Sequence, residues 1–284
     1  MPDVKEVVFH ADDFGWSPGI NEGIIDSHQH GILTSTSVIA TMPGLKDAVR
    51  RRDEAPSLGY GAHLSINLGR PISAPESVNL LLDQNGFFQY SYLYHLRKSS
   101  NKMYLNQVRR EISAQLVELG DLGFRLDHVN SQSHTHMIPP IRDLFQEVLQ
   151  EFSIRHLRRS VEPWHGRPRI RNPMNFVKCL TLETLDTFGS TPPGTVQFVG
   201  IRHSGLMDTQ TMVNYLRHLK SGTWEIASHP GTGELDDDSL YPQSAVRHMR
   251  SANRRLEWEA LVSNEVRTAL HEAEINPIRF SDIG

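Results

Sequence analysis

The sequence predicts an α/β protein folded as a distorted (β/α) barrel of seven or eight mainly parallel strands. Short β-branched or apolar runs alternate along the chain with helical patterns about as many times, which is the order expected of a parallel sheet. No G-x-G-x-x-G motif follows the first predicted strand, so the competing fold, an open sheet that binds a dinucleotide, is disfavoured. Polar residues also recur where the predicted strands end, as expected of a barrel with a site at that edge.

The first elements follow this alternation closely. Residues 4–9 are mostly β-branched and apolar, which suits a strand buried on both faces. The next helix has Ser17 as its N-cap and Pro18 at its first position. A helical stretch is predicted at 45–52, between strands at 36–42 and 58–64.

Residues 69–100 interrupt the pattern. They are rich in Pro, Gly, Ser and Tyr and have no clear period, so we expect an irregular insertion near the site. We find no convincing domain boundary, and residues 1–284 are therefore predicted to form a single domain.

The second half resumes the alternation with a strongly amphipathic helix. Val108, Ile112, Leu116 and Leu119 form its apolar stripe, and Gly123 ends it. The remaining predicted elements are strands at 126–129, 154–158, 196–199, 224–227 and 278–280 and helices at 139–152, 175–188, 209–219 and 252–274.

Composition limits the partners and the compartment. The formal net charge of −4 provides no basic field for nucleic acid, and no apolar run approaches the roughly 20 residues needed to span a bilayer. The single cysteine, Cys179, rules out an intramolecular disulfide framework, and the N-terminus lacks the pattern of a secretory signal. We expect a cytoplasmic protein without a nucleic-acid partner or a membrane span, and leave a homodimer open.

The polar residues at the predicted strand ends are acids, histidines and their neighbours. In (β/α) barrels the active site lies at the carboxyl ends of the strands. The residues found there, in chain order, are Asp12, Asp13, His63, Asn130, Gln132, His134, His136, Arg158 and His229.

Each of these residues also has a structural interpretation. An aspartate at a strand end is often a turn former, His63 could be a buried core histidine, and His229 in ASHPG could belong to a turn. Two adjacent aspartates are more informative, because one can reach a metal while the other faces the substrate where the chain turns.

The set suits metal-assisted hydrolysis. A divalent ion held by a carboxylate and imidazoles acidifies water or polarises an acyl oxygen, and three protein ligands leave an open position. A second carboxylate can then accept a proton, and an imidazole can protonate the leaving amine.

Six segments resemble the YdjC-like carbohydrate deacetylases, nearly from end to end. They are ADDFGWSPGINEGI, ILTSTSVIATMPG, GAHLSINLGRPIS, LRRSVEP, FVGIRHSG and WEIASHPG. The first and the last are the most specific. The resemblance implies a distorted barrel of the glycoside hydrolase/deacetylase type and a divalent metal cofactor, Mg²⁺ or Zn²⁺.

The resemblance also implies roles for individual residues. Asp13 and His63 would bind the metal, Asp12 would be the base and His229 the acid. The candidates on the substrate side are Arg158, Glu162 and His136.

One position departs from the family pattern. The third metal ligand is the first histidine of a D/N-x-H-x-H-x-H run, and this chain has Gln132 there. An amide oxygen suits a hard cation such as Mg²⁺ but is a poor zinc ligand. Either Gln132 ligates weakly, or His134 replaces it, or tight metal binding has been lost.

Three functions follow from these observations. The leading hypothesis is removal of an acetyl group from a small N-acetylated saccharide or sugar conjugate. The alternatives are a catalytically impaired sugar-binding or regulatory relative and a barrel metallohydrolase that acts on a non-sugar amide. Candidates for stacking on a sugar ring are Trp16, Tyr90, Tyr92 and Trp164.

Overall fold

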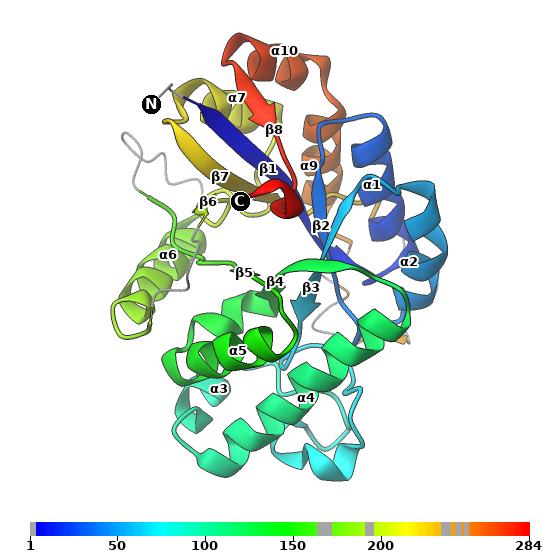
Figure 1. The fold of residues 1–284 in the computed structure, drawn as a ribbon, viewed down its shortest axis with the longest axis vertical. Coiled ribbons are helices and arrows are strands. Elements are labelled where there is room, and N and C mark those ends of the chain that lie inside the picture. Colours follow the sequence, from blue (N-terminus) through cyan, green and yellow to red (C-terminus); the bar gives the residue numbers. More distant parts are fainter. Residues whose placement is uncertain (1–3, 164–171, 191–195, 234–239, 242–245, 247–249) are drawn as a thin grey trace.

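The strands of the protein form one curled sheet in which every pairing is parallel (Figure 1). The computed structural model describes residues 4–163, 172–190, 196–233, 240–241, 246 and 250–284. The strand order is β5-β4-β3-β2-β1-β7-β6, with β8 paired to the first residues of β1. The predicted distorted barrel of seven or eight mainly parallel strands is thereby confirmed. The strands are β1 (Lys5–Phe14), β2 (Ser35–Val38), β3 (Gly59–Leu64), β4 (Leu126–Ser131), β5 (His156–Leu157), β6 (Gln197–Val199), β7 (Gly222–Ser228) and β8 (Ile275–Pro277).

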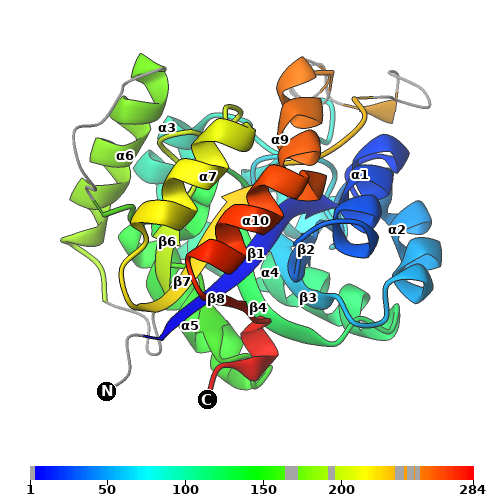
Figure 2. The same cartoon turned by 90° about the horizontal axis from the view of Figure 1, so that it is seen from above.

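Helices surround this sheet (Figure 1). Helices α1 and α2 lie beside each other, α4 packs on α5, and α9 contacts both α1 and α7. The view from above shows α7 and α10 next to each other, with α10 beside β8 (Figure 2). The helices are α1 (Pro18–Gln29), α2 (Leu45–Arg51), α3 (Tyr92–Lys98), α4 (Lys102–Asp121), α5 (Pro139–Glu151), α6 (Pro173–Asp186), α7 (Thr209–His218), α9 (Ala252–Val262) and α10 (Asn264–Glu272).

Local sequence signals account for several of these elements. Ser17 caps α1 by accepting the backbone N–H of Ile20, and Pro18 is its first residue. The four apolar residues predicted as the stripe of α4 are all buried, so this face of the helix packs on the core. Cys179 is also buried, as expected of a structural thiol.

Two predictions near the C-terminus were wrong. The helix expected over 252–274 is broken at Ser263, whose extended backbone ends α9 and whose hydroxyl accepts the N–H groups of Glu265 and Val266 to start α10. The last strand is Ile275–Pro277 rather than 278–280, and Phe280–Asp282 forms a 3₁₀ helix. Ile278 instead donates its N–H to Val7 just beyond the strand.

The segment 69–100 has more regular structure than expected. It contains two short 3₁₀ helices, Pro75–Ser77 and Asn79–Leu81, an isolated bridge between Leu82 and Phe88, and helix α3. In the described part of the chain, no helix has the length and apolar character needed to cross a membrane.

Candidate functional site

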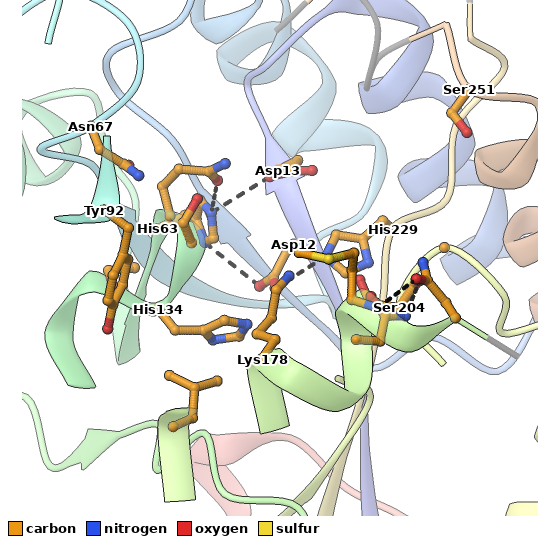
Figure 3. Close-up of a pocket in the computed structure, with 18 of the residues that line it drawn as sticks. Asp12, Asp13, His63, Asn67, Tyr92, His134, Lys178, Ser204, His229 and Ser251 are labelled. Atoms are coloured by element: carbon orange, nitrogen blue, oxygen red, sulfur yellow. Dashed lines mark hydrogen bonds and ion pairs between the residues drawn. The ribbon is translucent and has the colours of Figure 1, made fainter. Parts of the chain in front are cut away.

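A cavity of about 760 Å³ opens at the carboxyl ends of the strands. This volume is typical of sites that bind small molecules. The sequence-predicted residues that line it are Asp12, Asp13, His63, Gln132, His134 and His229. Asp12, Asp13, His63 and His229 turn toward one another in its floor (Figure 3).

A bulge in β1 brings both aspartates to the cavity. Ala11 pairs with Thr36 and Phe14 with Val38, so three steps along β1 match two along β2. Asp13 has a φ of 79°, in the left-handed region. Without such a bulge, adjacent side chains of a strand would point to opposite faces.

Gly15 completes this turn. Its φ of +97° is unfavourable for residues with a side chain, and a β-carbon there would lie 2.9 Å from the carbonyl oxygen of Ile39. Its N–H donates to Asn21 Oδ1 at 2.6 Å, which ties the turn to α1. The ADDFG sequence therefore determines the backbone conformation of this turn and also supplies the two carboxylates.

Asp12 is the most constrained carboxylate of the site. Its Oδ1 accepts hydrogen bonds from His10 Nε2 at 3.1 Å, Ser37 Oγ at 3.0 Å and Asn130 Nδ2 at 2.8 Å. Arg158 donates to both oxygens, to Oδ2 at 2.8 Å and to Oδ1 at 3.0 Å. Oδ1 is therefore saturated, and Oδ2 is the oxygen left to act on a substrate.

The charge of Asp12 is maintained despite its burial. Burial alone would raise the pKa of this carboxyl, but the charge of Arg158 and the hydrogen bond from His10 hold it well below its usual value. Burial lowers the pKa of His10 well below the ordinary histidine value, so that ring is neutral and donates a hydrogen bond. Asp12 is thus an ionised carboxylate near neutral pH.

Arg158 is shared between two buried acids. Besides Asp12 it contacts Glu225 Oε1, through Nε at 2.8 Å and Nη2 at 2.5 Å. Burial raises the pKa of Glu225, while the charge of Arg158 opposes this rise. The guanidinium of Arg158 therefore has one carboxylate on the cavity side and another behind it.

Asp13, His63 and Gln132 meet beside Asp12. His63 Nε2 lies 3.5 Å from Asp13 Oδ1 and 2.8 Å from Gln132 Oε1. His63 Nδ1 lies 2.6 Å from Asn130 Oδ1, an acceptor, and a hydrogen on Nδ1 would leave the Nε2 lone pair for an ion. Three acceptor atoms then face one another.

This arrangement fits a hard divalent cation. Ligands about 2.1 Å from an octahedral ion such as Mg²⁺ lie about 3.0 Å apart, and the two measured distances bracket that value. The set has one carboxylate, one imidazole and one amide. Among the described residues, no group of three His, Cys, Asp or Glu side chains could hold an ion; the set described here has the amide of Gln132 as its third member.

The sequence left open whether His134 takes the place of Gln132. His134 also lines the cavity, with its Nδ1 bonded to Ser160 Oγ at 2.9 Å, but Gln132 is the residue that contacts His63. Burial lowers the pKa of His134 well below its usual value, and the positive charges of Lys178 and Arg158 lower it further. Gln132 is therefore the candidate third donor that lies against His63.

His229 lies on the other side of Asp12. Its Nε2 is 3.7 Å from Asp12 Oδ2, and its Nδ1 is 3.6 Å from Glu257 Oε2. Burial opposes protonation, but Glu257 and then Asp13 and Asp12 outweigh it and raise the pKa of His229. The imidazole is 29% exposed, so it can meet a ligand as a proton donor.

Arg158 and Glu162, both predicted on the substrate side, do not line the cavity. Glu162 Oε2 accepts the N–H groups of residues 200–202, and its Oε1 accepts the Tyr215 hydroxyl at 2.6 Å. These bonds commit Oε2 of Glu162 to the loop after β6 and its Oε1 to helix α7. The geometry therefore supports a structural role for Glu162 rather than direct substrate binding.

His136, the third substrate-side candidate, is fully buried and also outside the cavity. Its Nδ1 bonds to Ser131 Oγ at 2.6 Å, and its Nε2 bonds to the carbonyl oxygen of Arg158 at 2.9 Å. Burial lowers the pKa of His136 to about 3, so it is neutral. It positions the backbone that carries Arg158.

Aromatic side chains also reach the cavity. Trp16, Tyr90 and Tyr92 line it, as expected of candidates for stacking on a ring. Trp164, the fourth candidate, lies outside the described residues.

Sequence reasoning missed the partners of the site residues. They are His10, Ser37, Glu225, Arg254 and Glu257. Three of them could have been recognised as polar residues in buried strands. His10 and Ser37 lie at inward positions of β1 and β2, and Glu225 lies in the buried part of β7. Arg254 and Glu257 are charged residues on a helix and resemble ordinary surface positions.

Comparison with known proteins gives consistent matches. A family model described as "YdjC-like protein" matches residues 6–272. A carbohydrate deacetylase of Thermoanaerobacter pseudethanolicus is 28% identical over 255 residues, 89% of this chain and 90% of that protein. A carbohydrate deacetylase of Brevibacillus brevis is 28% identical over 286 residues, 98% of this chain and 100% of that protein.

A solved structure supports the fold. A crystal structure from Enterococcus faecalis V583, described as that of a cellobiose-phosphate cleavage protein, matches with a TM-score of 0.74 and 23% identity. The match covers 99% of each chain. At this identity the likeness is evidence for the shared architecture.

Proposed function

Because the chain belongs to the YdjC-like protein family, we propose that it is a metal-dependent carbohydrate deacetylase. Its reaction is hydrolysis of an acetamido group on a small N-acetylated saccharide or sugar conjugate. The observation that carries the proposal is one cavity in which Asp12 Oδ2 faces His229 and lies beside the Asp13–His63–Gln132 donor set. The carbohydrate deacetylases of similar sequence support the class of substrate.

Asp12 acts as the general base in this proposal. Its Oδ2 accepts a proton from the water whose oxygen attacks the acetyl carbonyl carbon. The hydrogen bonds on Oδ1 and the Arg158 fork hold the carboxylate in one orientation throughout. Such positioning is the main contribution that fixed side chains can make to a hydrolytic step.

His229 acts as the general acid. When the carbon–nitrogen bond breaks, the protonated imidazole donates its proton to the departing nitrogen, which leaves as the free amine while acetate is formed. The raised pKa of His229 keeps this proton available near neutral pH. Glu257 holds the ring from behind.

Asp13, His63 and Gln132 would hold the cation. A divalent ion there supplies Lewis-acid polarisation of the acyl oxygen and lowers the pKa of water. Asn130 fixes the tautomer of His63, so that its Nε2 lone pair points at the site. Two of the three donors are oxygens, which suit Mg²⁺ better than Zn²⁺.

Acetate release is the direct test. The purified protein, with Mg²⁺ or Zn²⁺ added, should release acetate from N-acetylglucosamine oligomers, and Asp12→Asn should not. Activity confined to non-sugar amides would support the metallohydrolase alternative and refute the deacetylase. Absence of hydrolysis with every metal and substrate, together with sugar binding by the folded protein, would indicate the sugar-binding or regulatory relative.

A further inference from the structure

The ion pair between Asp13 and Arg254 has no part in the proposed reaction. Arg254 Nη2 donates to Asp13 Oδ2 at 2.6 Å, and the two side chains are 7% and 3% exposed. We propose that Arg254 sets the cation affinity of the site, because its fixed charge neutralises the only charged donor. The inference rests on the proposed function only in taking Asp13, His63 and Gln132 as the cation site.

Arg254 is held firmly in place. Its Nη1 lies 3.4 Å from the carbonyl oxygen of His229, and its guanidinium carbon lies 5.3 Å from the centre of the Trp16 ring. Gly231 lies beside the side chain, since a β-carbon built there would be in ordinary contact with Arg254 Cδ at 3.6 Å. A side chain fixed on these sides does not swing away when a cation arrives, so its charge remains beside Asp13.

No neighbouring group restores the negative charge that Asp13 loses to its ion pair with Arg254. Asp12 is already paired with Arg158, and Glu257, which also lines the cavity, lies against His229. Gln132 contributes no charge where a histidine would have contributed a stronger donor. The affinity of oxygen-rich sites for hard cations depends on how many charged ligands they have, and here a guanidinium offsets the single one.

The consequence is a cation that binds weakly and exchanges freely. Asp13 Oδ2 is committed to Arg254, so only Oδ1, which faces His63, remains for an ion. Bidentate binding by Asp13 is therefore closed as long as Arg254 stays in place. The protein would respond to the supply of divalent ion rather than retain one permanently.

Metal titration of variants tests this inference without measuring activity. Dissociation constants for Mg²⁺ and Mn²⁺ are measured by calorimetry for the parent chain and for Arg254→Met. We expect Arg254→Met to bind at least tenfold more tightly. The matched control is Arg255→Gln, which removes the same charge from an exposed side chain next along α9, paired with Glu259 at 3.1 Å, and should leave the affinity unchanged.

Arg254→Lys separates charge from shape. It keeps the positive charge, so we expect affinity within about threefold of the parent, and it remains informative if Arg254→Met does not fold. Unchanged or weaker binding by Arg254→Met would overturn the inference, as would tightening by Arg254→Lys of tenfold or more. A protein that binds metal as expected but releases no acetate would contradict the proposed function alone.

Discussion

Replacing Glu257 with glutamine should move the pH dependence of the reaction. Glu257 is 1% exposed, and its Oε2 lies 3.6 Å from His229 Nδ1 and accepts the His229 backbone N–H at 2.5 Å. Glutamine keeps the size and an acceptor oxygen but removes the negative charge. The change therefore tests electrostatics with little change in packing.

The distance sets the size of the effect. Two unit charges about 4 Å apart interact by about 4 kcal/mol at an effective dielectric of 20. Because His229 is 29% exposed, solvent weakens this interaction, and we expect roughly 1–2 kcal/mol to remain, or about one pH unit. Asp13 and Asp12 still favour the charged ring in the variant.

The direction follows from the role of His229. A raised pKa keeps the acid protonated to higher pH, and activity is lost as the pH rises through that pKa. In Glu257→Gln the alkaline limb of kcat/KM should therefore move to lower pH by about one unit, with near-parental activity on its acid side. The assay is acetate release across pH at saturating metal.

Glu259→Gln is the matched control, since Glu259 is an exposed acid on the same helix. Its pH profile should coincide with that of the parent. An unchanged alkaline limb in a folded Glu257→Gln protein would refute the assignment of His229 as the acid that Glu257 supports.

Three further predictions concern the base, the third donor and the core. Asp12→Asn should retain metal binding and lose about 10²–10⁴-fold in kcat, because proton transfer to a positioned base contributes that much; calorimetry and acetate release measure the two effects. Gln132→His should tighten metal binding in a calorimetric titration, and unchanged affinity would remove Gln132 from the donor set. Ile112→Ala, at a fully buried position of α4, should lower the free energy of unfolding by about 2–5 kcal/mol in denaturant titrations.

Elements that have a local signal in the sequence were predicted correctly. The alternation of strands and helices predicted the parallel sheet, and Ser17 and Pro18 predicted the start of α1. The weakest prediction was the C-terminal helix, where apolar periodicity continues through Ser263 although the chain is extended there. Periodicity reports which face is buried and does not detect a break between two helices that share that face.

The candidate site was predictable only in part, for a related reason. Asp12, Asp13 and His63 could be found because each ends a strand, and the carboxyl ends of parallel strands meet at one edge. Arg254 and Glu257 come from a helix about 240 and 30 residues along the chain from their partners, and only the packing of that helix brings them to the site. Arg158 and Glu162 were predicted to face the substrate, but neither lines the cavity. Arg158 is bonded to Asp12 and Glu225, and Glu162 is bonded to the backbone after β6 and to Tyr215.

We propose that the cavity hydrolyses an N-acetyl group on a saccharide with the help of a divalent cation. The most direct test is the rate of acetate release from an N-acetylglucosamine oligomer as Mg²⁺ is added to chelator-treated protein. We predict a rate near zero without the ion and a saturable rise as it is added, with one free amine formed per acetate. An equal rate in the presence of chelator, or no acetate at any concentration of the ion, would contradict the account.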